Sequence, residues 1–315
     1  MKNELTALVA AIRAQPWAIL PEYLEAIEAI AVRALDEDVL ARVAADGHEA
    51  LMAESRAAVA AVGRPLEGAA MSTLRGATAV IPVVGAIFPR ASMVGASTGG
   101  SALSTIMRDV RVAWASAEVE RIVMLYDSPG GVVSGLGEAA ETLRASPKPI
   151  TSFVTGTGAS AAYWLASQAG EIVLDRSGRV GSIGVVASMS QQESADANGR
   201  RSYEIVSSGA PKKRPDPSTE EGRAAIQSEI DAIEDVFVAD VAAGRGVSAA
   251  RVRADFGQGA MVDAAAAVAV GMADRIGTLE GELKKDPGKT RARGAGSRAR
   301  ASADFETRRR AAERN

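Results

Sequence analysis

Short apolar segments alternate with amphipathic ones between Thr78 and Leu283, and this alternation predicts an α/β fold built from βαβ units around a mostly parallel sheet. Glycine-rich turns follow several of the apolar segments, as expected where a strand ends. The chain has 315 residues, 47% of them hydrophobic and 24% charged, which is a globular composition with room for one large domain or two ordinary ones.

The first 70 or so residues have the periodicity of helices and carry no catalytic pattern. Leu5, Leu8 and Ile12 recur at helical spacing, Gln15-Pro16-Trp17 interrupts the run, and Pro21 can open a further helix. We expect residues 1–70 to form a helical accessory or assembly segment that precedes the α/β domain.

The α/β domain is predicted to cover residues 78–283. Its expected strands are Thr78–Phe88 (a strand pair or one bent strand, with Pro82 and Gly85 at the bends), Arg121–Tyr126, Pro149–Val154, Glu171–Leu174 and Val180–Val186. Its expected helices are Ser101–Ala115, Ser134–Arg144, Ser160–Gln168, Met189–Asn198, Ser218–Ala243, Ser248–Asp255 and Asp263–Val270.

The carboxyl-terminal residues 284–315 differ in composition from the rest. They contain 11 Lys and Arg against 4 Asp and Glu, a net charge of +7, and show no apolar periodicity. The first 283 residues contain 25 Lys and Arg against 35 Asp and Glu, a net charge of −10. We expect a basic, disordered tail that stays solvated or meets an anionic partner, and this tail is the one place where nucleic acid could bind.

Composition also excludes several classes of site. The chain has no cysteine, which excludes disulfides, thiolate metal sites and a cysteine nucleophile. Its single histidine, His48, lies among helical segments far from the glycine-rich centre, so a Ser-His-Asp site is not expected. We expect no metal and no cofactor. The amino terminus lacks the apolar core of a signal peptide, and no apolar run is long enough to span a bilayer, so we expect a soluble cytoplasmic protein.

One stretch dominates the search for function: Thr155–Ala166, which reads T-G-T-G-A-S-A-A-Y-W-L-A. Small residues allow a tight turn between a strand and a helix, and Ser160 stands where the helix begins. Free backbone N–H groups at that point suit a nucleophile whose attack creates an oxyanion. The alternative is that Ser160 only caps the helix and the small residues only allow close packing.

Three further patches could join Ser160. The turn Asp127-Ser128-Pro129-Gly130-Gly131 follows a strand and can expose N–H groups for an oxyanion hole, although ordinary turns look the same. Ser182, within V-G-S-I-G-V, could orient a base. Lys212 and Lys213 end the stretch S-S-G-A-P-K-K, where the alternative is a solvated basic loop. Serine hydrolases can use a neutral lysine as base.

Taken in order, D-S-P-G-G, G-T-G-A-S-A-A-Y-W, V-G-S-I-G-V and S-G-A-P-K resemble the signal-peptide-peptidase (SppA-type) family of Ser-Lys peptidases. The resemblance runs from about Thr78 to Gly277 and implies the Clp protease/crotonase fold of repeated ββα and βαβ units. Ser160 and Lys212 are separated by 52 positions. Two departures are Ala161-Ala162, where relatives commonly have a glycine pair, and Pro211, where a larger residue is usual.

The resemblance implies a role for each matching residue. Ser160 is the nucleophile, Lys212 the general base, Gly131 an oxyanion N–H donor joined by Ala161 N–H, and Ser182 with Gly130 supports the site. A lysine base working at pH 7–8 must have its pKa lowered by about 2–3 units from ~10.4, which burial among apolar groups supplies.

The length of the chain and its helical amino-terminal segment point to a narrower group within this family. A half-length member with a segment near R-A-Q-P-W-A-I-L-P is similar to the head-maturation proteases of tailed phages, which implies scaffold or capsid proteins as substrates in the host cytoplasm or a prohead. It also implies a ring-like homo-oligomer, in which the dyad lies within one subunit or is shared between two. A cellular signal-peptide-peptidase-like protease is the alternative within the family.

Two functions from other classes remain open. An acyl-CoA hydratase or isomerase on the same fold would use glycine-rich N–H pairs for a thioester enolate but needs no Ser-Lys pair. A non-catalytic assembly protein would keep the fold and use its helical segment and basic tail for docking.

Overall fold

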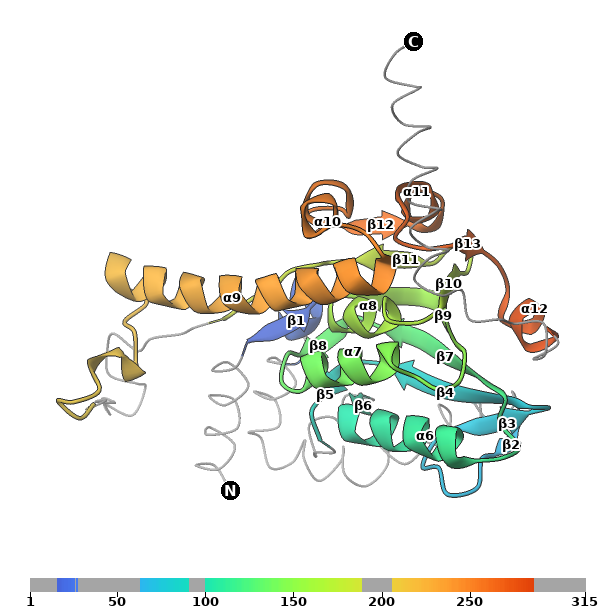
Figure 1. Ribbon diagram of the computed structural model, residues 1–315. Helices are drawn as coiled ribbons and strands as arrows, with labels where there is room; N and C mark the ends of the chain where they lie inside the picture. The colour runs from blue at the N-terminus through green and yellow to red at the C-terminus, as the bar shows by residue number, and fades with distance from the viewer. Residues whose placement is uncertain (1–15, 26, 28–62, 91–99, 189–205, 286–315) are drawn as a thin grey trace, which may run out of the picture.

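The computed structural model describes residues 16–25, 27, 63–90, 100–188 and 206–285. Within this part of the chain, a large mixed sheet packs against helices and a smaller second sheet lies beside it (Figure 1). The α/β class expected from the alternating pattern is therefore confirmed. His48, the predicted helix Met189–Asn198 and the tail beyond Lys285 lie outside the described residues.

The large sheet has the order β12-β11-β9-β7-β4-β3-β2, and β10 adds to β9 and in turn pairs with β13. Its centre is parallel, because β4 pairs with β7, β7 with β9, and β9 with both β10 and β11 in the same direction. The strands are β2 (Arg64–Pro65), β3 (Thr73–Arg75), β4 (Thr78–Val84), β7 (Arg121–Ser128), β9 (Ile150–Ala159), β10 (Glu171–Leu174), β11 (Arg179–Gly181), β12 (Met261–Asp263) and β13 (Arg275–Ile276).

The central parallel strands are rich in apolar residues because both of their faces are buried. Alternate side chains, such as Ile81, Ile122 and Met124, point into the main core with the helices. The intervening side chains form a second layer on the opposite face, where Leu283 packs on them. That layer consists of Val80, Val123, Phe153 and Val173.

Helices supply the other half of the core. Those described are α6 (Leu103–Ala115), α7 (Leu136–Arg144), α8 (Ala161–Ala166), α9 (Glu220–Arg245), α10 (Ala249–Asp255), α11 (Ala264–Val270) and α12 (Leu279–Leu283), with the 3₁₀ turn η2 (Pro211–Lys213) before α9. The long helix α9 packs on α8 through its carboxyl-terminal part. The Trp164 and Phe237 rings stack with centroids 4.4 Å apart, and Trp164 Nε1 donates to Asp240 at 2.9 Å.

A second, four-stranded sheet has the order β1-β8-β5-β6 and shares no strand with the first. It consists of β1 (Trp17–Ile19), β8 (Gly130–Val132), β5 (Ile87–Phe88) and β6 (Ser101–Ala102). Trp17, Ile19, Phe88 and Val132 share a small hydrophobic cluster that is separate from the main core. The predicted strand pair at Thr78–Phe88 is therefore split between the two sheets at Gly85, whose φ is +67°.

Four predicted segments need correction. Trp17–Ile19 is a strand inside the segment expected to be helical, whereas the helix expected from Pro21 is present. β9 continues through Gly156 and Gly158 to Ala159, so the turn falls at Ser160 itself. Gly156 is needed for close approach, because a Cβ there would lie 2.8 Å from Asp127 Oδ1. The strand predicted over Val180–Val186 is only Arg179–Gly181, and Pro82 lies within β4 rather than at a bend.

None of the described helices is both long and apolar enough to cross a bilayer. In the same residues, no group of three or more His, Cys, Asp and Glu side chains is placed to hold a metal ion.

Asp109 of α6 organises the loop that leads into β3. Its carboxylate, which is buried, accepts from the backbone N–H groups of Ala70, Met71 and Ser72 at 2.8–3.0 Å and from the Ser72 hydroxyl at 2.7 Å. Four donors thus depend on a single side chain, so the entry to the large sheet is fixed by one residue.

We predict that Asp109→Ala lowers the free energy of unfolding by about 3 kcal/mol or more, because each buried donor left unpaired costs about 1–3 kcal/mol. Glu118→Ala is the matched control: its salt bridge to Arg64 is exposed and should contribute less than about 1 kcal/mol. Urea denaturation of both variants measures the difference, and equal losses would contradict the assignment.

Candidate active site

Three of the four motifs meet at the carboxyl ends of adjacent parallel strands. D-S-P-G-G joins the end of β7 to the start of β8, G-T-G-A-S ends β9, and V-G-S ends β11. The register places Ser128 opposite Gly158 and Gly181 opposite Ala159. This edge is where open parallel sheets bind ligands, because loops diverge there above a rigid scaffold.

Ser160 links the end of β9 to the start of α8. Its side chain is fully buried, and its backbone adopts φ 54° and ψ −117°, a region that non-glycine residues rarely occupy. The Ser160 N–H donates to Gly181 O at 2.7 Å, while its hydroxyl has no hydrogen-bond partner among the described residues. A strained backbone that presents an unpaired buried hydroxyl indicates a functional group rather than a structural one.

The alternative role of Ser160 as a helix cap is wrong for its side chain. Ser160 occupies the N-cap position of α8 but makes no capping hydrogen bond. In the same chain, Thr219, Ser248, Asp263 and Thr278 each accept a backbone N–H from three residues along their helix. The fold therefore uses side-chain caps elsewhere and leaves the Ser160 hydroxyl free.

The helix behind Ser160 is held rigidly. The Tyr163 hydroxyl donates to Met272 O at 2.9 Å, and burial raises the pKa of Tyr163, which keeps the phenol protonated as a donor. Gln168 Nε2 donates to Asp240 O at 3.2 Å, which ties the end of α8 to α9. Motion of α8 would break these contacts, so the position of Ser160 is set by the core.

The P-G-G turn lies directly beside Ser160. A Cβ at Gly130 would be 3.0 Å from Ser160 Cβ, and the φ of Gly130 is +107°. Gly131 is equally confined, since a Cβ there would meet Ile87 O at 2.0 Å. Ser128 Oγ donates to Gly85 O at 2.7 Å and accepts from Gly130 N–H at 3.3 Å, which fixes the turn. Gly130 is thus adjacent to the nucleophile candidate, and Gly131 follows it in the chain.

Ser182 follows the residue whose carbonyl holds the Ser160 N–H. It has a positive φ of 52°, and its own N–H donates to Ala260 O at 3.0 Å. Asp127 was not given a role from sequence, although its Oδ1 accepts from Thr157 N–H at 3.0 Å and so ties the first motif to β9. The position of Asp127 as the first residue of D-S-P-G-G is the sequence signal that could have identified it.

The fourth motif does not join the others within one chain. Lys212 and Lys213 are exposed in the turn η2. The segment before α9, drawn in yellow at the left of Figure 1, projects away from the sheet and from α8. A helix rises about 1.5 Å per residue. The 17 residue steps from Glu220 to Phe237 therefore hold the start of α9 roughly 25 Å from its contact with α8.

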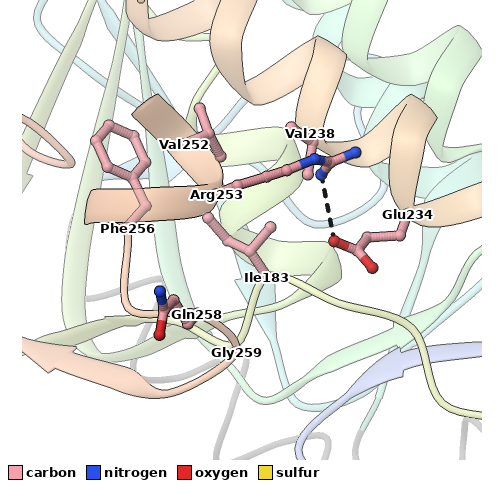
Figure 2. A pocket seen from close by; sticks show the side chains of 8 residues that line it. All are labelled: Ile183, Glu234, Val238, Val252, Arg253, Phe256, Gln258 and Gly259. Carbon is pink, nitrogen blue, oxygen red and sulfur yellow. Dashed lines mark hydrogen bonds and ion pairs between the residues drawn. The ribbon is translucent and has the colours of Figure 1, made fainter. Parts of the chain in front are cut away.

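A cavity of about 300 Å³ lies between α9 and α10 (Figure 2). Val238, Val252 and Phe256 supply apolar walls, and Arg253 pairs with Glu234 at 3.3 Å across it. Ile183 links the cavity to the neighbourhood of Ser182, but Ser160 is not among the residues that line it. The cavity is a neighbour of the site rather than the place where a substrate meets Ser160.

Comparison with known proteins decides the family. Residues 142–286 match peptidase family S49, and this range contains Ser160, Ser182 and Lys212. This segment is a peptidase family S49 domain. The S49 domain has the Clp protease/crotonase type of fold, which confirms the fold predicted from the four motifs. D-S-P-G-G lies just before the matched range and joins the domain through β7.

Similar proteins include phage and bacterial proteases. The head-tail preconnector protein GP5 of Enterobacteria phage P21 is 27% identical over 203 residues, which is 63% of this chain and 40% of the relative. The capsid assembly protease C of Escherichia phage lambda is 27% identical over 175 residues, 54% of this chain and 40% of the relative. Protease 4 of Salmonella typhi is 34% identical over 113 residues, 35% of this chain and 18% of the relative. The chain thus matches about two fifths of each phage relative's length.

We predict opposite stability effects for two buried serines of this region. Ser160→Ala should leave the free energy of unfolding unchanged or raise it by about 1 kcal/mol, since an unpaired buried hydroxyl is removed. Ser152→Ala should lower it by about 1 kcal/mol, because Ser152 Oγ donates to Ala166 O at 3.0 Å. Denaturant titrations test both, and a larger loss for Ser160→Ala would refute the interpretation of its hydroxyl.

Proposed function

We propose that this protein is a serine endopeptidase that uses Ser160 as nucleophile and Lys212 as general base. The observation that carries the proposal is the strained, buried Ser160, whose unpaired hydroxyl lies beside the P-G-G turn in an S49 domain. The family match covers residues 142–286, and the proposal assigns peptidase activity to the whole chain.

The mechanism follows from these positions. Neutral Lys212 takes the proton from Ser160 Oγ, which attacks the carbonyl carbon of a peptide bond. The developing oxyanion is held by the N–H groups of Gly131 and Ala161, in the place that the tight turn at Gly130 leaves open. The protonated lysine then gives its proton to the leaving amine. Water, activated by the lysine, releases the acyl group from Ser160, and Ser182 supports the lysine.

We further propose that the dyad is completed between two subunits of a homo-oligomer. A lysine acts as base only when covered from water, and Lys212 is exposed in the turn before α9, a segment that projects away from α8 (Figure 1). The amino-terminal half of α9, which follows this turn, also has apolar side chains that the described residues cover only in part. Ile226, Ile230 and Ile233 recur on it at helical spacing and are only partly buried, in line with the Phe237 that packs on α8. A neighbouring subunit would cover this stripe and bring Lys212 to a second Ser160.

The phage relatives point to a substrate class. One is named as a capsid assembly protease and another as a head-tail preconnector protein. We propose that this chain processes scaffold or capsid proteins of a tailed phage during head maturation, in the host cytoplasm or within a prohead. A non-catalytic assembly role is the second candidate, and the remote position of Lys212 in the single chain favours it.

The proposal predicts that Ser160→Ala abolishes peptide hydrolysis, since loss of the nucleophile in such a unit costs ~10⁶ in turnover. A serine-reactive fluorophosphonate should label the wild-type protein at Ser160, as mapped by mass spectrometry, and should not label the variant. Activity of Ser160→Ala within tenfold of wild type would remove Ser160 from the mechanism. Turnover of acyl-CoA thioesters instead of peptides would favour the hydratase or isomerase.

The two adjacent lysines are predicted to behave differently. Lys212→Ala and Lys212→Arg should both be inactive, because a guanidinium stays protonated and cannot act as base. Lys213→Ala should retain activity, since successive side chains in a 3₁₀ turn point about 120° apart. Peptide hydrolysis by the three variants is the measurement. An inactive Lys213→Ala beside an active Lys212→Ala would place the base one residue later.

Sharing of the dyad predicts complementation. When Ser160→Ala and Lys212→Ala protomers are coassembled at random, roughly a quarter of the sites should pair an intact serine with an intact lysine. Activity should recover to near that fraction. Verified mixed oligomers that stay inactive would show that both groups come from one chain.

A further inference from the structure

The strand β1 lies where an extended peptide would have to lie in order to reach Ser160. It pairs antiparallel with β8, in the register Trp17 to Val132, Ala18 to Gly131 and Ile19 to Gly130. On its other edge, Trp17 N–H donates to Val186 O at 2.9 Å and Trp17 O accepts from Val186 N–H at 2.8 Å. β1 is therefore held between the strand that carries the oxyanion candidates and the segment that follows Ser182.

The peptide unit between Ala18 and Ile19 is next to the nucleophile. A Cβ built on Gly130 would meet Ala18 O at 2.2 Å, Ile19 Cα at 2.9 Å and Ser160 Cβ at 3.0 Å. Since all three surround one point, Ala18 O and Ser160 Cβ are separated by no more than about the sum of their two distances, near 5 Å. No side chain can be inserted at Gly130 without displacing either β1 or Ser160.

The direction of the Ala18 carbonyl follows from strand geometry. Successive residues of a strand send their N–H and C=O groups to opposite edges. Because Trp17 uses both groups toward Val186, Ala18 directs its groups toward β8, where Gly131 is its partner. Gly131 N–H is the group that we assign to the oxyanion hole, so Ala18 presents its carbonyl to that group from the substrate side.

We propose that Pro16–Leu20 is an internal pseudo-substrate that occupies the peptide groove, with Ala18 in the position of the residue whose carbonyl is attacked. The inference rests on the proposed function for the role of Ser160. A peptide substrate has to displace β1 and then pairs antiparallel with β8 in its place. The groove selects extended peptides with a small residue at the position of Ala18, which is fully buried within the main core.

Displacement of β1 takes only one small side chain, that of Ala18, out of the main core. Trp17 and Ile19 are anchored in the small cluster beside the second sheet, where the Trp17 and Phe88 rings pack edge to face with centroids 6.0 Å apart. Local opening of such a unit is less costly than global unfolding. The free energy needed to displace the pseudo-substrate is therefore set mainly by the packing of Trp17 and Ile19.

A reversible cross-link between β1 and β8 tests the proposal. The chain has no cysteine, so Trp17→Cys with Val132→Cys gives a protein with a single possible disulfide. These residues are directly opposite each other and belong to the closely spaced type of pair, about 4.5 Å between Cα atoms, which a disulfide can bridge. The substrate is a fluorogenic peptide with the sequence of residues 14–22, A-Q-P-W-A-I-L-P-E.

We expect the oxidised protein to cleave this peptide at less than a tenth of the rate of the reduced protein, with full recovery on reduction. Val132→Cys alone is the matched control and should not respond to reductant. Equal rates before and after reduction, with the disulfide verified by mass spectrometry, would overturn the pseudo-substrate while leaving the peptidase proposal intact.

A binding measurement separates this inference from catalysis. In the Ser160→Ala background, a fluorescein-labelled copy of the same peptide should bind the reduced double-cysteine protein at least tenfold more tightly than the oxidised one, by fluorescence anisotropy. If the peptide binds the reduced protein more tightly but no form that retains Ser160 hydrolyses it, the groove assignment stands and the peptidase proposal is refuted. Equal affinity in the two redox states, or no binding to either, would refute the groove.

Discussion

The parallel pairing of β7, β9 and β11 is the constraint on which the rest of the structure depends. Register between these strands brings the turns that follow them to one point, and the Ser160 N–H closes the arrangement by donating to Gly181 O. The positive φ of Ser160 is costly by itself, by about 1–3 kcal/mol. It persists because the buried sheet on one side and the anchored helix α8 on the other leave the residue no alternative.

The residues proposed for catalysis are divided between a rigid centre and the segment that precedes α9. Ser160, Gly130 and Gly131 belong to the centre, where added atoms would collide with backbone. Lys212 belongs to the segment before α9, whose first half is poorly covered. Under the proposed mechanism, the single chain lacks a base beside Ser160 until subunits assemble. The proposed pseudo-substrate would restrict access to Ser160 in addition.

Much of the fold could be predicted from sequence, because buried parallel strands and amphipathic helices have distinct apolar periodicities. α6, α7, α9, α10 and α11 begin and end within a few residues of the predicted bounds. The errors occur where local signals conflict with tertiary contacts. Gly156 and Gly158 indicate a turn by composition, yet they lie in β9 because Asp127 and neighbouring side chains need the space that a Cβ would fill. Trp17–Ile19 is too short for periodicity to identify, and it becomes a strand only because β8 offers it an edge.

The sequence by itself determined which groups are available for the proposed chemistry: a serine at a strand-to-helix junction, a P-G-G turn and a downstream lysine, with no cysteine and a single histidine. Residue types and their order carry that information because each group's reactivity is local. Only the tertiary structure decided which groups meet. Three motifs converge because strand register is a property of the whole sheet. Lys212 stays apart from Ser160 in the single chain because a long helix separates it from the core, and Trp17–Ile19 pairs with β8 because an open strand edge binds whichever extended segment fits it.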